Sequence, residues 1–301
     1  MVLSSVPRVV VVTRSTDYEN LLVQHATRSQ AIFFLKSRGQ SLEEIETQHL
    51  KLKEAVRVTM SIIPSSWRRA YVEREMLNRF LFEPLDYIVV VGQDGLVANV
   101  AKYLDEQLVF GINPNSDCFD GVLVPLSIEW LPDLFDLAAK KTCQVQKRTI
   151  VKAEMDDGQI LMALNELFVG HRGHQSARYK ISMKNKEENQ SSSGIIISTG
   201  TGCTGWASSI SQGRVRKLKL PRPEDNKLVF FVREAFSSVS TSSALVQGII
   251  PRGEELEVRS EMNNGGVVFG DGIESDYIPF DWGKKLKVSV SCKKLNLVSG
   301  I

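Results

Sequence analysis

Apolar positions in the first half of the chain gather in short runs that alternate with longer mixed segments. Runs rich in Val and Ile span residues 8–13, 87–91 and 108–112, and their length is typical of strands buried on both faces. Ser41 and Glu44 make a capping-box pattern that begins a helix between two of them. Strand signals alternating with helix signals predict an α/β domain, a parallel sheet with helices, over residues 1–142.

Other segments of this half carry weaker signals. The stretch that ends near Gly39 is a mixed polar segment. Ser61–Ile63 is predicted to end a second strand, and Ser65 or Ser66 to cap a helix that runs to about Phe82. The remaining predicted helices of this half span residues 96–104 and 126–141.

After Cys143 the pattern becomes one of strands. Residues 145–155 and 160–169 are predicted strands, joined by the hairpin signal Asp156-Asp157-Gly158. The polar segments 184–193 and 213–227 are predicted linkers, and the basic run RVRKLKLPRP in the second is expected to be a solvated loop. Residues 143–301 therefore form a predicted β-rich domain, whose last residues are free to return to the first domain. Further strand signals span residues 179–183, 195–198, 228–232, 256–259, 267–269 and 286–290.

Composition narrows the class of protein. The 301 residues are 43% hydrophobic and 24% charged, as in an ordinary folded protein. A net charge of +2 gives no reason to expect a nucleic acid or a membrane surface as partner. The N-terminus lacks the layout of a signal peptide, and no apolar run approaches the ~20 residues of a spanning helix. These two features, together with four Cys that are scattered along the chain, predict a cytoplasmic protein with free thiols.

Two polar interruptions of apolar strands are candidate sites. Gly92-Gln93-Asp94-Gly95 follows the run 87–91, and it is either a tight turn or a ligand loop at a strand end. Asn165-Glu166 breaks the apolar stretch LMALNELFV, where polar side chains are costly unless satisfied. The pair either lies at an edge with internal partners or binds hydroxyl groups of a ligand.

Two other motifs are ambiguous. Residues 200–205 read GTGCTG and satisfy G-x-G-x-x-G, but the sequence then returns to strands, whereas a dinucleotide fingerprint opens a βαβ unit. The loop still offers N–H groups and hydroxyls to a polar ligand. His171 and His174 are expected to lie in a surface loop, and no metal site is predicted. The sequence contains no P-loop motif.

Taken in order, these pieces resemble the NAD kinase family. Its members show a Gly-Gly-Asp-Gly loop, an Asn-Glu pair, a Ser-Thr-x-Thr-Gly-x-Thr-x-aromatic segment and a late Asp-Gly. This chain has Gly92 to Gly95, Asn165-Glu166, STGTGCTGW (198–206) and Asp271-Gly272. GINPNSDCFDGVLVP (111–125) is similar to the GVN segment of the family, and closest to its divergent mitochondrial-type branch.

The resemblance implies a two-domain NAD kinase-like fold with NAD and nucleotide bound in the cleft between the domains. It implies that the enzyme transfers the γ-phosphate of ATP, with Mg²⁺, to the 2′-hydroxyl of the adenosine ribose of NAD. A homodimer is also implied. Asp94 would be the base at that hydroxyl, with Gly92 and Gln93 in the phosphate loop. The residues implied to bind NAD are Gly95, Asn165, Glu166, Thr204, Gly205, Trp206, Ala207 and Ser209.

Three positions depart from the family pattern. Gln93 stands where the family usually has Gly, Leu96 where it has Thr, and Ser193 where the classical branch has Asp. Alternative functions therefore stay open: a catalytically weak NAD(P)-binding sensor, a lipid or sphingoid kinase of similar fold, and a Rossmann oxidoreductase. The phosphoryl donor, ATP or polyphosphate, and the choice between NAD and NADH are also open.

Overall fold

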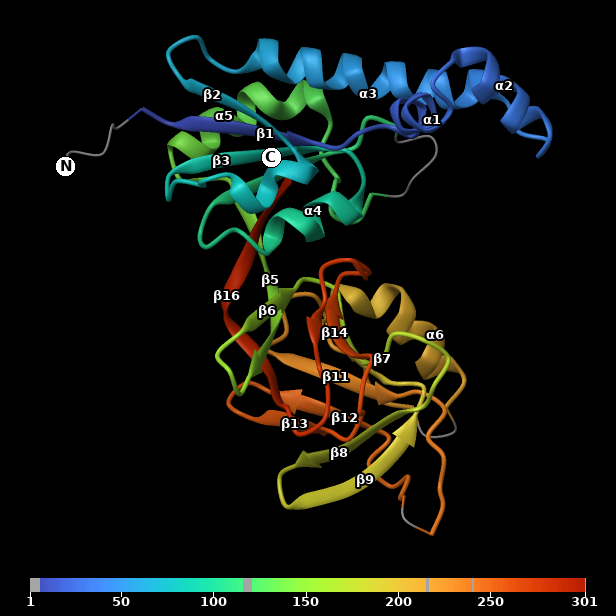
Figure 1. Cartoon of the computed structure of the whole chain (residues 1–301). Coiled ribbons are helices and arrows are strands. Elements are labelled where there is room, and N and C mark those ends of the chain that lie inside the picture. The colour runs from blue at the N-terminus through green and yellow to red at the C-terminus, as the bar shows by residue number, and fades with distance from the viewer. Residues whose placement is uncertain (1–5, 116–120, 215–216, 240, 301) are drawn as a thin grey trace. The chain divides into compact units, whose positions relative to one another are not determined.

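The computed structural model describes residues 6–115, 121–214, 217–239 and 241–300 of the chain (Figure 1). The chain forms two compact units. Unit 1 comprises Met1–Gln146 with Asn296–Ile301, and unit 2 comprises Lys147–Leu295. The α/β character predicted for the first part and the β-rich character predicted for the second are both confirmed.

A parallel sheet forms the centre of unit 1. Its strands lie in the order β2, β1, β3, β4 and the end of β16, and every neighbouring pair is parallel. The Val-rich runs of β1 and β3 are almost wholly buried because helices cover both faces. These strands span Arg8–Thr13 (β1), Arg68–Glu73 (β2), Asp86–Val91 (β3), Leu108–Ile112 (β4) and Lys285–Gly300 (β16).

Helices sandwich this sheet. Helices α3 and α5 pack on the side of Val9 and Val11, where they share one apolar core with β3 and β4. Helix α4 lies on the other side of the strands (Figure 1). Helices α1 and α2 pack against α3. The bounds are Asp17–His25 (α1), Arg28–Lys36 (α2), Leu42–Ile62 (α3), Asp94–Ala101 (α4) and Leu131–Ala139 (α5), with 3-10 helices at Arg74–Arg79 and Ile128–Trp130.

Two sequence predictions for unit 1 are wrong. Ser61–Ile63 lies at the end of the long helix α3, which stops just before Pro64, and is not part of a strand. The helix predicted from Ser65 to Phe82 is instead β2 followed by a 3-10 helix. Because β2 is an edge strand that buries only Val72, its sequence contains no apolar run that would predict a strand.

The polar stretch before Gly39 holds α1 and α2, which were not predicted. A capping box does begin α1: Thr16 accepts the N–H of Glu19, and the Glu19 carboxylate accepts the N–H of Thr16. Because α1 has no buried residue, the apolar stripe that would mark a helix is missing. At the start of α3, Ser41 caps the helix as predicted, but its hydroxyl accepts the N–H of Glu43 rather than that of Glu44, the partner in the predicted capping box.

Unit 2 is built from two layers of strands. The first is an antiparallel sheet in the order β12, β11, β10, β7, β14, β15, and the second joins β16, β13, β8 and β9, with β5 and β6 beside β16. Alternate residues of both layers meet in one apolar core. The strands span Gln144–Met155 (β5), Ile160–Ala163 (β6), Glu166–His171 (β7), Ala177–Met183 (β8), Lys186–Ser192 (β9), Ile195–Ser198 (β10), Lys227–Val232 (β11), Gln247–Pro251 (β12), Glu255–Ser260 (β13), Gly266–Gly270 (β14) and Ile278–Pro279 (β15).

Two further predictions need correction in unit 2. The polar segment 184–193 is no linker: it forms β9, which pairs with β8 and buries only Gln190 and Ser192. The single strand predicted over 160–169 breaks at Leu164-Asn165 into β6 and β7. Helix α6 (Trp206–Gln212) covers the outer face of the six-stranded sheet, where Ala207 and Ile210 pack against β11.

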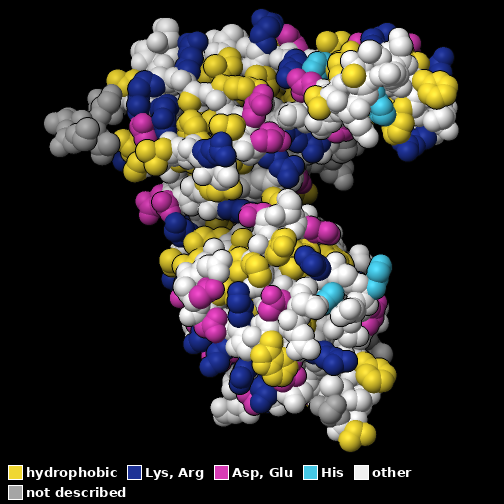
Figure 2. Space-filling model, in the orientation of Figure 1, with side chains coloured by type: hydrophobic (Ala, Val, Ile, Leu, Met, Phe, Trp, Pro, Cys, Tyr) yellow, Lys and Arg dark blue, Asp and Glu magenta, His cyan; other side chains and the backbone are white. Residues whose placement is uncertain are grey.

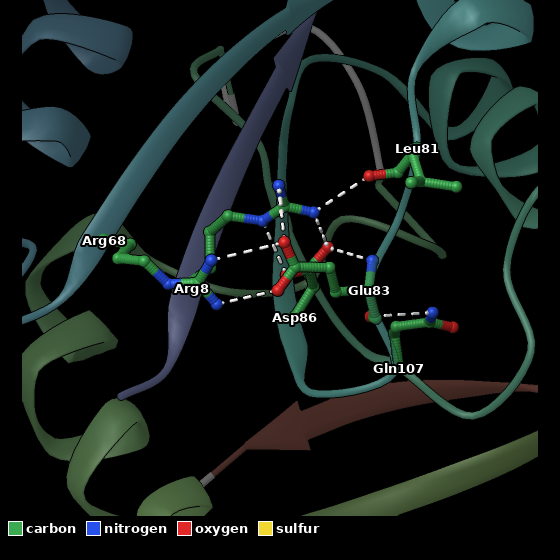
Figure 3. A network of polar contacts seen from close by, with 6 residues as sticks. All are labelled: Arg8, Arg68, Leu81, Glu83, Asp86 and Gln107. Atoms are coloured by element: carbon green, nitrogen blue, oxygen red, sulfur yellow. Dashed lines mark hydrogen bonds and ion pairs between the residues drawn. The ribbon is translucent and has the colours of Figure 1, made fainter. Parts of the chain in front are cut away.

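A buried charge network holds the amino ends of β1 and β3 together (Figure 3). Asp86 is 1% exposed, and its carboxylate accepts Arg8 Nε at 2.8 Å and Nη2 at 2.6 Å, as well as the N–H of Glu83 at 2.7 Å. Glu83 in turn pairs with Arg68 of β2. Since each polar atom of Asp86 has a partner, the charge is tolerated in the interior.

Surface charge is mixed. On the face that Figure 2 shows, Lys and Arg side chains are interspersed with Asp and Glu in both units. Within the described ranges, no helix is both long and apolar enough to cross a membrane. Cys143, Cys203 and Cys292 are free thiols, and Cys118 lies outside the described residues.

Candidate functional site

The first cluster of candidate residues lies at the carboxyl end of β3, in unit 1. Asp94 is the first residue of α4, and its carboxylate accepts the N–H of Val122 at 3.0 Å and of Leu123 at 2.8 Å. These contacts fix the carboxylate against the segment that follows β4. A carboxylate has about four acceptor positions, so two of them stay available to a ligand hydroxyl. Asp94 is thus not part of a simple tight turn.

Gln93 causes no backbone strain in this loop. Its φ is −101° and its ψ is 165°, an extended conformation open to any residue, so the usual Gly is not required here for a left-handed conformation. The Gln93 side chain reaches the residue just after β1, where its Oε1 accepts Arg14 Nη2 at 3.2 Å. Leu96 packs close to Gly92, where a Cβ would lie 3.2 Å from Leu96 Cδ2. Beside Gly95, by contrast, a Cβ would meet nothing within 4 Å.

A pocket opens beside this loop, entirely within unit 1. Its polar lining includes Arg14, Gln93 and Asn113, and its wall includes His49, whose Nδ1 lies 2.8 Å from the hydroxyl of Thr16. The carboxyl ends of parallel strands are where α/β sheets bind ligands. Neither Arg14 nor His49 belongs to a sequence motif, so neither was predicted as a site residue. The segment 111–125 contributes Asn113 to this pocket, but its residues 116–120 lie outside the described part.

The second cluster lies in unit 2, at the break between β6 and β7. Asp271 accepts the N–H of Leu164 at 3.1 Å and of Asn165 at 2.7 Å, and donates its own N–H to the carbonyl of Glu166 at 3.0 Å. The N–H of Thr199 donates to the carbonyl of Asn165 at 2.9 Å. The structure therefore brings Asn165-Glu166, Asp271 and the start of the Gly/Thr loop (residues 200–205) together.

Glu166 is half-buried beside another acid. Burial, with a smaller contribution from the charge of Asp271, raises the pKa of Glu166 to about 7. The Glu166 carboxyl group is therefore poised between its protonated and ionised forms near neutral pH. Perturbed pKa values of this kind gather at functional sites, although structural acids also show them.

The Gly/Thr loop packs directly on this cluster. A Cβ at Gly202 would lie 2.3 Å from the carbonyl oxygen of Asn165, and a Cβ at Gly200 would lie 1.9 Å from that of Arg222. Both glycines are thus required by close backbone contact. The hydroxyl of Thr201 is buried and has no hydrogen-bond partner among the described residues. Thr204 is an exposed residue, and its hydroxyl donates to the carbonyl of Thr201 at 3.2 Å.

The residues after the loop divide between surface and core. Gly205 precedes α6, and Trp206, its first residue, is 39% exposed with its ring parallel to Phe168 at 6.3 Å. Ser209 is exposed one turn later. Ala207 is 1% exposed and packs among apolar side chains, so it supports the helix and offers its side chain to no ligand.

The chain context of the loop excludes a Rossmann unit. A helix does follow the glycines, which was not predicted, but the next strand, β11, is antiparallel to β10. A βαβ unit needs parallel strands. His171 ends β7, and the described residues contain no group of three or more His, Cys, Asp or Glu that could hold a metal ion.

Comparison with known proteins adds a sequence relationship. No known family model matches the chain. Over 132 residues the chain is 32% identical to the NAD kinase of Clostridium botulinum strain Eklund 17B (type B), and 31% identical to that of strain Alaska E43 (type E3). Over that segment the chain is similar in sequence to these NAD kinases. The matched segment is 41% of this chain and 45% of each relative, so it spans less than half the length of these NAD kinases.

The fold extends the comparison to the whole chain. The crystal structure of yeast NADH kinase complexed with NADH superposes with a TM-score of 0.59, covering 99% of this chain and 85% of that one. The sequences are 14% identical, so this likeness shows a shared fold and nothing finer. Together, the NAD kinase relatives and the fold confirm the family resemblance read from the ordered motifs.

Proposed function

We propose that this protein is an ATP-dependent NAD kinase, which transfers the γ-phosphate of ATP to the 2′-hydroxyl of the adenosine ribose of NAD. One observation carries the proposal: Asn165-Glu166, Asp271 and the Gly/Thr loop form a single hydrogen-bonded cluster in a chain related to the NAD kinases. The three segments lie in contact in unit 2, although more than 30 residues separate each segment from the next along the chain.

In this proposal the cluster of unit 2 holds the dinucleotide. The amide of Asn165 and the carboxylate of Glu166 bind ribose hydroxyls, since both lie at an interruption of a buried strand where a ligand would satisfy them. Trp206 offers an exposed indole on which a ring can stack. Thr204 and Ser209 contribute hydroxyls, and Gly205 and Ala207 contribute backbone.

The loop of unit 1 holds the phosphates of the donor. Gly92 and Gln93 lead into the amino end of α4, and backbone N–H groups there favour an anion. Gly95 leaves open space for close approach. Arg14 adds a guanidinium to the same pocket. Mg²⁺ enters as the MgATP substrate, because Mg²⁺ is commonly held by substrate phosphates with one or two carboxylates.

Asp94 is the proposed base. Its carboxylate takes the proton of the 2′-hydroxyl, the hydroxyl oxygen bonds to the γ-phosphorus, and the bond from that phosphorus to the β-phosphate oxygen breaks to release ADP. The two backbone N–H groups that hold the Asp94 carboxylate fix its position, so that it can orient the hydroxyl. A homodimer and a cytoplasmic location belong to the same proposal.

A coupled assay for NADP formed from NAD and MgATP tests the proposed function. The wild-type chain is expected to form NADP in the presence of both substrates, and parallel assays with NADH and with polyphosphate identify the preferred pair. Binding of NAD without turnover would favour the sensor alternative instead. Phosphorylation of a sphingoid base without NADP formation would favour the lipid kinase.

A further inference from the structure

A second polar pocket lies in unit 2, beside the exposed ring of Trp206. It is lined by Ser209, Ile210, Gly213 and Arg214 at the end of α6, and by Arg233 and Glu234 just after β11. Ser209, Ile210 and Gly213 follow Trp206 by three, four and seven residues. Residues at this spacing share one face of a helix, so the pocket continues the face of α6 that carries the indole.

Two guanidinium groups in this pocket have unused donors. Arg214 donates from Nη2 to the carbonyl of Val232, and the Arg233 guanidinium lies 5.1 Å from the centre of the Trp206 ring. Within the described residues, neither arginine forms an ion pair with a carboxylate. An arginine has five N–H donors, so most of those donors are open to a ligand.

The acid in the pocket does not neutralise both arginines. Glu234 accepts the hydroxyl of Ser193, which occupies part of its hydrogen-bonding capacity. The three charged lining residues, Arg214, Arg233 and Glu234, leave the pocket with a net positive charge. Ser209 adds a hydroxyl. Paired guanidinium groups and hydroxyls are the groups that recognise phosphate, and they favour a phosphate over an uncharged ligand.

The geometry points to a phosphate subsite formed by Arg214 and Arg233, adjoining the stacking surface of Trp206. Its ligand is a phosphate ester attached to a nucleoside, because one guanidinium lies against the indole that would hold the ring. The inference rests on the proposed function in one respect: within the NAD kinase reaction, the phosphate bound here belongs to the dinucleotide. The positive subsite then makes the protein select phosphorylated nucleosides over phosphate-free ones.

Calorimetry with AMP, adenosine and inorganic phosphate tests this subsite on the full chain. Wild-type protein is expected to bind AMP at least about tenfold more tightly than adenosine, the scale of a hydrogen bond to a charged group. Arg214→Gln and Arg233→Gln should each remove most of that preference. Lys219→Gln is the matched control, since Lys219 is an exposed cation of the same segment that does not line the pocket.

The outcomes separate this inference from the proposed function. Equal affinity for AMP and adenosine, or an AMP preference that survives both arginine substitutions, overturns the subsite. If inorganic phosphate binds as tightly as AMP, the nucleoside contributes nothing to binding, and this result also overturns the proposed subsite. NADP formation, assayed separately, decides the proposed function: a chain that makes NADP but keeps its AMP preference in both Arg214→Gln and Arg233→Gln loses only the subsite.

Discussion

At the scale of single residues, Asp94 and Asp271 make the same pair of contacts in different units. Each carboxylate accepts the N–H groups of two successive residues, Val122-Leu123 for Asp94 and Leu164-Asn165 for Asp271. Both would pass for turn residues in the sequence, because Asp beside Gly is common in turns. Their nearest partners are 28 and 106 residues away along the chain, so no local pattern could reveal them.

Asp94→Asn should separate the chemical role of Asp94 from its structural one. The amide keeps one acceptor but turns a donor toward a backbone N–H, so we expect a loss of roughly 1–3 kcal/mol in the free energy of unfolding. NADP formation should fall by at least ~10²-fold, while NAD affinity changes little. Coupled assays, calorimetry and chemical denaturation measure the three quantities. Turnover near that of the wild type would leave Asp94 with the structural role alone.

Glu166→Gln should change how stability depends on pH. The folded pKa of about 7 lies above the ordinary value of 4.5, so the folded state holds the proton more tightly than the unfolded state. Wild-type stability should therefore fall as pH rises from about 4.5 through about 7, by on the order of 2–3 kcal/mol. The glutamine variant, which cannot ionise, should lack this part of the pH dependence. Parallel slopes in denaturation series at pH 5 to 8 would contradict the raised pKa.

At the scale of elements, the sequence predicts what is buried and misses what is not. The strands β1, β3, β4 and β10 were predicted within a residue of their observed bounds, because buried strands are continuous apolar runs. The exposed helix α1 and the strands β2 and β9 were missed, because tertiary pairing rather than composition decides their structure. The same holds for the candidate site. Glu166 can be identified in the sequence because it interrupts an apolar strand, whereas nothing in the sequence distinguishes Arg14 and Arg233 from ordinary surface residues.

The clamp of Arg8 on Asp86 is expected to stabilise the sheet of unit 1. Asp86→Ala removes a buried acceptor and leaves Arg8 and the N–H of Glu83 without it, so the free energy of unfolding should fall by about 3–5 kcal/mol. Glu54→Gln, which breaks the exposed pair with Arg57, is the control and should cost far less. Urea denaturation compares the two, and equal losses would mean that the buried pair adds nothing.

At the scale of the whole molecule, two segments connect the units. The chain leaves unit 1 within β5 and returns to it within β16, whose earlier part pairs with β13 and whose last part pairs with β4. Leu297 and Val298 are 1% and 0% exposed, and Val298 packs in the same core as α3 and α5. Unit 1 therefore depends on side chains that lie far from the rest of it in the sequence.

Val298→Ala should weaken unit 1 selectively. Removal of buried methyl groups in a closed core costs on the order of 1–3 kcal/mol, and hydrogen exchange should accelerate in β3 and β4 before it does in β10 and β11. The variant also serves as the stability control for Asp94→Asn, since it loosens unit 1 without touching the loop at Asp94. Faster exchange in unit 2 alone would contradict the assignment of this strand end to unit 1.

The late return of β16 also bears on how the protein is made. Unit 2 is a continuous stretch of chain, so all of its residues are available for folding as soon as Leu295 has emerged from the ribosome. The sheet of unit 1 begins with β1 at Arg8, yet it leaves one edge of β4 unpaired until Asn296 and Leu297 follow. An unpaired edge of a nascent sheet is a template for aggregation. The part of the chain translated first is thus the part that finishes folding last, and it is the part that a chaperone would have to shield.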